Sequence, residues 1–184
     1  MRILLHAGPV ECAALREALR ADPERAKHVT FTGLFLPGVN TFDYGGLTDT
    51  SRVEGTFVPP SSSAMFAAGR LDFLPLHYSA FIAHLARHPA DLAILHLPPA
   101  EAGRFSCGLG ADVADGVRRL ARQVAVIVNP SIPRTEGATA LAEEEADWVC
   151  EVDAPLAAHM ESDPDPVLTQ VGRRVADLIE DGDT

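Results

Sequence analysis

The sequence has few cysteines, and it has no apolar run long enough to cross a membrane. Cys12, Cys107 and Cys150 are odd in number, far apart and without Cys-x-x-Cys spacing, which argues against a disulfide framework and a structural zinc site. No window approaches the roughly 18 apolar residues that a membrane span needs. The first residues lead into a strand-like segment rather than a signal peptide. These absences predict a cytoplasmic protein with no membrane association and no metal ion.

Basic residues are also scarce. Lys27 is the only lysine, and 15 basic side chains stand against 26 acidic ones, so the formal net charge is −11. The whole excess lies in residues 143–184, which hold 13 acidic and 2 basic side chains. Because binding to a nucleic-acid backbone needs a basic surface, we expect no nucleic-acid partner. The acidic end is either a solvated surface or a face that docks onto a basic partner domain.

Apolar residues make up 47% of the 184 residues, which is typical of one globular domain spanning 1–184. Strand-like apolar runs alternate with segments of helical periodicity. This alternation predicts an α/β fold, with an open, mostly parallel sheet and helices on both faces. The predicted strands are 3–6, 28–34, 53–58, 71–76, 91–97, 124–128 and 148–152. The predicted helices are 9–19, 61–68, 79–87, 112–122 and 167–179, and residues 37–52 form the longest loop.

Two loops near predicted strand ends are candidate binding sites, because ligands of open parallel sheets bind outside the carboxyl ends of the strands. Asn129–Gly137 follows the clearest strand and is stiffened by Pro130 and Pro133; it is either a site loop or a structural connection. Ser106–Gly110 precedes a predicted helix, whose first amides attract anions. The spacing is not Gly-x-Gly-x-x-Gly, and Asp112 opposes an anion, so a tight turn is the alternative.

Two further patterns indicate no chemistry. His84 and His88 share a predicted helix face, but they lack a third ligand and the Glu of a His-Glu-x-x-His zinc motif. Cys107 has no neighbouring base and lies outside any Gly-x-Ser-x-Gly turn, so we expect it to be a small buried residue. No residue is predicted to be catalytic.

Four residue blocks, taken together, resemble a known family. They are Gly69–Pro75 (G-R-L-D-F-L-P), Asp91–Pro99 followed by Gly103–Gly110, Val128–Gly137 (V-N-P-S-I-P-R-T-E-G) and Glu151–Leu156 (E-V-D-A-P-L). Their order and separation resemble the amino-terminal domain of the acetyl-CoA hydrolase/transferase family, the class I CoA-transferases. The resemblance is strongest over residues 69–156 and weaker over residues 1–68.

The resemblance implies a domain that packs against a second one, with the active site between them. In the family, CoA moves between an acyl-CoA and a small carboxylate through a glutamyl-CoA thioester, and the nucleophilic Glu belongs to the carboxyl-terminal domain. Residues 167–184 are expected to form a terminal helix leading toward that domain. Because the nucleophile belongs to the second domain, we expect this chain alone to be inactive. Coenzyme A is then a substrate. The residues implied to shape the substrate pocket are Ser106, Gly108, Gly110, Asn129, Pro133 and Gly137.

Three functions stay open. The first is the amino-terminal half of a CoA-transferase or acyl-CoA hydrolase, partnered by a carboxyl-terminal CoA-transferase domain or subunit, or by a second copy of the chain. It predicts an exposed apolar surface that a partner covers. The second is a non-catalytic module that keeps the fold and binds CoA or a partner. The third is another enzyme on a similar sheet, such as a sugar-phosphate isomerase, for which Arg104 and Arg134 make a sparse phosphate site.

Overall fold

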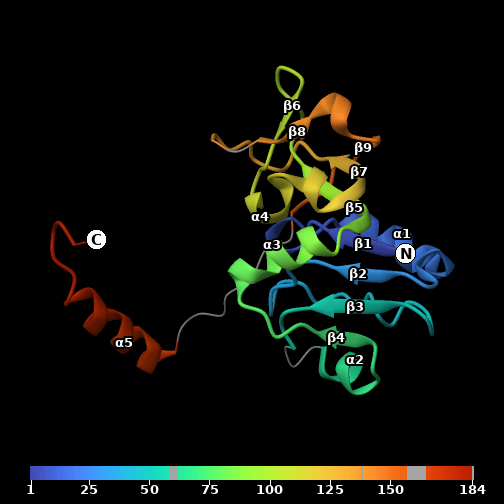
Figure 1. The fold of residues 1–184 in the computed structure, drawn as a ribbon. Helices are drawn as coiled ribbons and strands as arrows, with labels where there is room; N and C mark the ends of the chain where they lie inside the picture. The colour runs from blue at the N-terminus through green and yellow to red at the C-terminus, as the bar shows by residue number, and fades with distance from the viewer. Residues whose placement is uncertain (59–61, 138, 157–164, 184) are drawn as a thin grey trace.

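The computed structural model describes residues 1–58, 62–137, 139–156 and 165–183. Its centre is a seven-stranded sheet in the order β4-β3-β2-β1-β5-β7-β9 (Figure 1). Every neighbouring pair of strands is parallel, which confirms the predicted α/β class. The strands are β1 Arg2–Leu5, β2 Thr30–Thr32, β3 Arg52–Gly55, β4 Leu71–Phe73, β5 Ala90–Leu97, β7 Ala121–Val128 and β9 Trp148–Glu151.

The strand order creates a switch point between β1 and β5. From β1 the chain moves outward through β2, β3 and β4, and it then returns to pair β5 with the other side of β1. Since all seven strands run in one direction, their carboxyl ends meet at a single edge. Ligands of open α/β sheets bind outside this edge, at the switch point.

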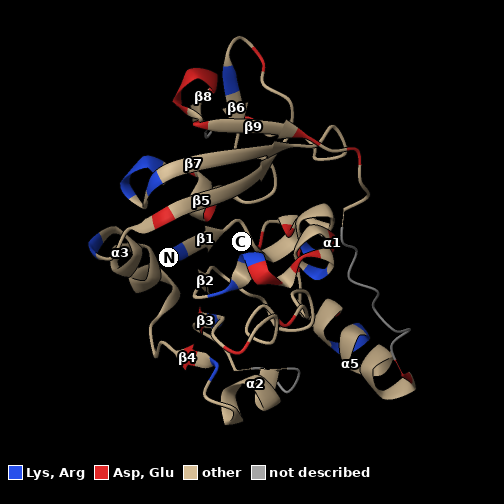
Figure 2. Ribbon diagram, turned by 90° about the vertical axis from the view of Figure 1, so that its right-hand side faces the viewer, with Lys and Arg blue, Asp and Glu red and all other residues tan. Residues whose placement is uncertain are grey.

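Helices cover both faces of the sheet (Figure 2). α3 (Tyr78–Arg87) lies on one side and α1 (Ala13–Ala21) on the other. The larger apolar core surrounds β5 and β7 and includes Phe81 and Leu85 of α3. The second core includes Leu19 of α1. A short helix, α2 (Ser63–Ala67), precedes β4 within the helix predicted at 61–68, and residue 61 lies outside the described residues.

A two-stranded antiparallel sheet was not predicted. β6 (Arg104–Ser106) pairs with β8 (Thr139–Ala142). β6 leads into Ser106–Gly110, and β8 follows Asn129–Gly137 after a short interval. The small sheet therefore holds the two candidate loops near each other.

The helix predicted at 112–122 is wrong as a single element. α4 covers only Ala111–Ala114, and a separate 3₁₀ turn covers Val117–Arg119. Gly116 separates them with a φ of 72°, a left-handed conformation that no helix interior contains. The chain is then free to enter β7 at Ala121, earlier than predicted. The helix predicted at 9–19 is likewise divided, because extended residues follow a 3₁₀ turn at 8–10 before α1 begins.

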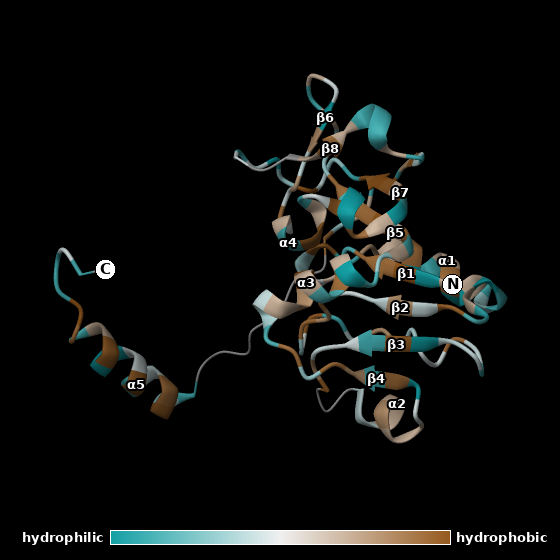
Figure 3. Cartoon of the chain, viewed as in Figure 1, coloured by the Kyte–Doolittle hydropathy of each residue, from teal (hydrophilic) through white to brown (hydrophobic). Residues whose placement is uncertain are grey.

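The predicted helix near the end of the chain is confirmed as α5 (Pro166–Ala176). Asp165 caps it by accepting the Leu168 N–H at 2.8 Å, and Pro166 suits the first turn. None of its residues is buried, and the helix lies apart from the sheet (Figures 1 and 3). The exposed apolar residues in and after α5 are Val167, Leu168, Val171, Val175, Leu178 and Ile179. In the described part of the chain, no helix is long and apolar enough to cross a membrane.

Candidate functional site

An open groove lies at the carboxyl ends of β1 and β2, next to the switch point. Its volume is about 520 Å³, within the roughly 300–1,000 Å³ of small-molecule sites. We call it the central groove. Segments after β1, β2 and β6 build its walls together with α4 and one side chain of α3. The lining residues are Gly8, Pro9, Leu34, Leu36, Tyr78, Leu109, Gly110, Ala111, Asp112 and Asp115.

The central groove is acidic. Asp112 and Asp115 line it, the Tyr78 hydroxyl donates to Asp112 Oδ2 at 3.4 Å, and none of the lining residues is basic. The turn at Ser106–Gly110 is tight, with the Gly110 N–H donating to the Cys107 carbonyl at 3.2 Å. Because α4 is a single turn that carries its own carboxylate, the tight-turn alternative describes this loop better than a phosphate cradle.

Ser106 joins the two candidate loops. Its hydroxyl donates to the Thr135 carbonyl at 2.9 Å and accepts the N–H groups of Gly108 and Thr135 at 3.2 and 3.1 Å. The Thr135 hydroxyl in turn donates to the Gly108 carbonyl at 2.9 Å. Gly108 has a φ of 59°, and a Cβ there would lie 2.8 Å from Ile132 Cγ2. Buried Ser106 and Gly108 therefore hold the loops together.

The six predicted site residues fall into two groups. Gly110 lines the central groove, and Pro133 and Gly137 are exposed on the loop after β7. Asn129 has no exposed surface, and its amide Nδ2 donates to the Ala154 carbonyl at 2.9 Å while its Oδ1 accepts the Ser131 N–H at 3.0 Å. Asn129 thus belongs with Ser106 and Gly108 behind the surface.

Sequence reasoning missed two buried histidines at this edge. His6 follows β1, and its Nε2 donates to the Gly110 carbonyl at 2.7 Å. His96 lies near the end of β5, and its Nδ1 donates to the Val10 carbonyl at 2.8 Å. Burial lowers the pKa of both imidazoles, which favours their neutral forms. The available signal was a polar residue at or just after the end of an apolar strand.

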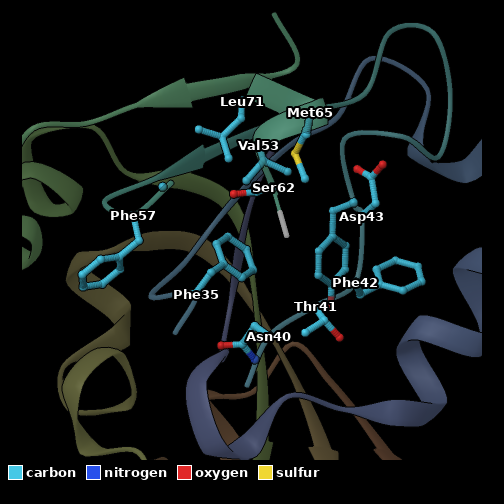
Figure 4. A pocket seen from close by; sticks show the side chains of 12 residues that line it. Phe35, Asn40, Thr41, Phe42, Asp43, Val53, Phe57, Ser62, Met65 and Leu71 are labelled. Carbon is cyan, nitrogen blue, oxygen red and sulfur yellow. The ribbon is translucent and has the colours of Figure 1, made fainter. Parts of the chain in front are cut away.

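A small aromatic pocket lies farther along the edge, beyond β2 and β3 (Figure 4). Phe35, Phe42, Phe57 and Met65 are among the residues that line it, and the predicted long loop supplies the wall from Asn40 to Tyr44. Its volume is about 40 Å³, room for about three water-sized groups at roughly 10–15 Å³ each. Only a small apolar group fits it.

The loop that walls this pocket is anchored by buried polar contacts. The Tyr44 hydroxyl donates to Glu11 Oε1 at 3.0 Å, and Arg16 pairs with Glu11 Oε2 at 3.1 Å. Burial and the Glu11 carboxylate raise the pKa of Tyr44, so the phenol stays protonated and keeps its donor. Asn40 accepts the Gly8 N–H at 3.1 Å and thereby connects this pocket to the central groove.

Cys107 and the pair His84 and His88 were predicted to have no chemical role. Cys107 is buried, and burial raises its pKa to about 11, so the thiol is protonated at neutral pH. His84 of α3 and His88, which directly follows the helix, lie beside each other with ring centroids 4.8 Å apart. Among the described residues, no three His, Cys, Asp or Glu side chains are grouped to hold a metal ion.

Curated relatives of the chain are CoA transferases. Over 134 residues the chain is 32% identical to the succinyl-CoA:cyclohexane-1-carboxylate CoA transferase of Geobacter metallireducens, which covers 71% of the chain and 30% of that protein. Over 150 residues it is 26% identical to the 4-hydroxybutyrate coenzyme A transferase of Clostridium kluyveri, covering 80% and 35%. The chain belongs to the CoA-transferase family. It spans about a third of the length of these relatives. No protein-family model matches it.

Solved structures share the fold of this CoA-transferase domain. RipA from Yersinia pestis has a TM-score of 0.81 at 22% identity, covering 98% of the chain and 45% of RipA. A 4-hydroxybutyrate CoA-transferase from Porphyromonas gingivalis has a TM-score of 0.63 at 20% identity, covering 100% and 43%. A chain of a Pseudomonas malonate decarboxylase hetero-tetramer has a TM-score of 0.56 at 18% identity, covering 85% and 31%.

Proposed function

We propose that this domain forms one wall of an active site that moves CoA between an acyl-CoA and a small carboxylate. A second CoA-transferase domain, in the same chain or in another subunit, forms the other wall and supplies the nucleophilic Glu. The observation that carries the proposal is the match to two CoA transferases over about a third of their length, together with a groove at the switch point.

The proposed reaction proceeds through two covalent intermediates. The Glu carboxylate attacks the acyl carbonyl carbon, CoA leaves as a thiolate, and a mixed anhydride forms. The thiolate then attacks the glutamyl carbonyl carbon, which yields the glutamyl-CoA thioester and releases the acyl group as a carboxylate. The incoming carboxylate attacks the thioester and reverses both steps. Water in place of that carboxylate gives hydrolysis.

The described glutamates of this domain support a nucleophile located elsewhere. None of them lines the central groove. Glu11 is buried and bound to Tyr44 and Arg16, so its carboxylate is enclosed. Glu101 pairs with Arg134 at 2.9 Å on the surface. We therefore keep the assignment of the nucleophile to the second domain.

The charge of the central groove and the volume of the aromatic pocket suggest which part of an acyl-CoA each site binds. Asp112 and Asp115 repel phosphates, so we assign the central groove to an uncharged part of the substrate. The apolar pocket around Phe35 and Phe57 suits a short acyl chain, because it admits only a few heavy atoms. The relative from Geobacter metallireducens is named for an apolar carboxylic acid, which agrees with an apolar acyl group here.

The exposed apolar stripe of α5 supports a partner domain. Its members include Val171 and Val175, each 53% exposed, and Leu178, 79% exposed. A stripe of this kind on a water-soluble helix is typical of a surface that another element covers. The excess of acidic residues in the same region predicts a basic face on that partner.

The experiment is a CoA-transfer assay of the purified chain with acetyl-CoA and acetate, paired with calorimetric titration of CoA. We expect no turnover by residues 1–184 alone and turnover once the second domain is present. Turnover by the chain alone would contradict the proposal. CoA binding without turnover in the presence of the second domain would instead favour the non-catalytic module.

A further inference from the structure

A continuous chain of buried hydrogen bonds lies directly behind the switch point. It begins at the Gly110 carbonyl, which His6 Nε2 contacts at 2.7 Å. Because Nε2 carries the hydrogen, His6 Nδ1 accepts the His96 N–H at 3.4 Å, and the His96 carbonyl oxygen lies 3.1 Å from the same nitrogen. The His96 ring then lies 3.1 Å from Asn129 Nδ2, which also donates to the Ala154 carbonyl. His96 lies in β5, and His6 and Asn129 directly follow β1 and β7, the strands on either side of β5 at the centre of the sheet.

The hydrogen-bond partners of His96 and Asn129 determine which of their side-chain atoms carry hydrogens. The Val10 carbonyl only accepts, so His96 Nδ1 carries a hydrogen. Asn129 Oδ1 faces the Ser131 N–H and Nδ2 faces the Ala154 carbonyl, and turning the amide over would place like groups against each other. Nδ2 therefore donates to His96 Nε2, which must be unprotonated. His96 is thus neutral with its hydrogen on Nδ1.

We propose that His6, His96 and Asn129 are positioning residues that fix the Gly108–Gly110 turn, one wall of the central groove, against the carboxyl ends of β1, β5 and β7. This assignment deepens the proposed function and rests on it for its effect on turnover. Its structural part stands on the contacts alone.

The contacts of Gly110 explain why the turn depends on His6. A Cβ at Gly110 would lie 2.4 Å from His6 Nε2, so the imidazole packs directly against this backbone. The helix that follows the turn has only four residues, Ala111–Ala114, and supplies little rigidity of its own. The hydrogen bond from His6 is consequently a main restraint on the groove wall.

The same chain restrains the other loops of the edge. His96 holds Val10 after β1, and Asn129 holds Ser131 after β7 and Ala154 after β9. Apolar residues of similar size would fill the space but would leave these backbone groups unpaired. The network thus sets the relative positions of four segments that lead away from one edge.

The first arm of the test uses the unaltered chain. Long-range ¹H–¹⁵N correlation spectra of ¹⁵N-histidine-labelled protein identify which ring nitrogen carries the hydrogen. We expect His96 to be neutral with its hydrogen on Nδ1. A hydrogen on Nε2 at neutral pH would overturn the proposal, because Asn129 Nδ2 would then face a second donor and keep only the Ala154 carbonyl as an acceptor.

The second arm compares amide hydrogen exchange in variants. His6→Leu removes the donor to Gly110, whereas His6→Gln retains an N–H near the same place. We expect exchange of the Gly110 amide to rise about fivefold in His6→Leu, the effect of losing roughly one hydrogen bond. It should stay near the wild-type rate in His6→Gln and in the control His88→Leu, a substitution at an exposed residue just after α3. An equal rise in β5 and β7 amides would indicate general destabilisation and overturn a positioning role.

The third arm measures kinetics with the second domain present. We expect His6→Leu to raise the KM for acyl-CoA more than it lowers kcat, and His6→Gln to restore the wild-type KM. A wild-type KM in His6→Leu would overturn the effect on the groove. If the first two arms succeed and the unaltered holoenzyme shows no turnover, the proposed function fails while the structural positioning of the turn stands.

Discussion

Replacing Asn129 with leucine tests the contacts that hold the carboxyl edge together. Asn129 is fully buried and bonds to the His96 ring, the Ala154 carbonyl and the Ser131 N–H. Leucine has the same number of side-chain heavy atoms with the same branching, so no cavity forms, but those three groups lose their partner. At about 1 kcal/mol or more for each buried unpaired group, the free energy of unfolding should fall by about 3 kcal/mol or more.

Thermal unfolding followed by circular dichroism measures this loss. For a domain of this size, 3 kcal/mol lowers the melting temperature by about 6–12 °C. The matched control is Gln123→Leu, an exposed amide on the same strand β7, whose free energy of unfolding should change by no more than about 0.5 kcal/mol. Equal melting temperatures for Asn129→Leu and Gln123→Leu would refute the reasoning.

Three further predictions concern other parts of the domain. Gly55→Ala adds a methyl group to the aromatic pocket, where its nearest neighbour is the Phe57 carbonyl oxygen at 3.8 Å, so the melting temperature should hold while kcat/KM of the holoenzyme falls more for longer acyl chains; an equal fall for all chain lengths contradicts this. Iodoacetamide at about pH 8 should modify exposed Cys150 well before Cys107, whose pKa burial raises to about 11, and equal labelling by peptide mass spectrometry would show otherwise. The Val124 N–H lowers the pKa of Asp147, so the ionised Asp147 carboxylate stabilises the folded state. This stabilisation is fully present above the unfolded-state pKa of about 3.9 and is lost as pH falls through the lower folded-state value. Asp147→Asn should therefore reduce the fall in melting temperature on acidification, and an unchanged acid profile would count against this role.

The main sheet was predictable because its central strands have local signatures. β5 and β7 are apolar runs followed by Pro98 and Pro130, and both strands were predicted within a few residues. The error at 112–122 has a local cause as well, since Gly116 interrupts an otherwise helical pattern with a left-handed conformation. β6 and β8 were missed because their sequences, Arg-Phe-Ser and Thr-Ala-Leu-Ala, contain few of the β-branched and aromatic residues that favour strands.

The candidate site was only half visible in the sequence. The loops at Ser106–Gly110 and Asn129–Gly137 were recognisable as loops, because Gly and Pro mark such turns locally, and their role in binding stays a prediction. The contact between His6 and His96 depends on the parallel pairing of β1 with β5, which brings together residues 90 positions apart. The aromatic pocket likewise combines Phe35 and Phe57 from segments that follow different strands.

The covalent intermediate provides the most direct test of the division of roles between two domains. The holoenzyme is incubated with acyl-CoA, the thioester is reduced with borohydride, and the modified peptide is identified by mass spectrometry. The account predicts one modified glutamate in the second domain and unmodified glutamates throughout residues 1–184. A modified glutamate within this chain, such as Glu101 or Glu136, would contradict it.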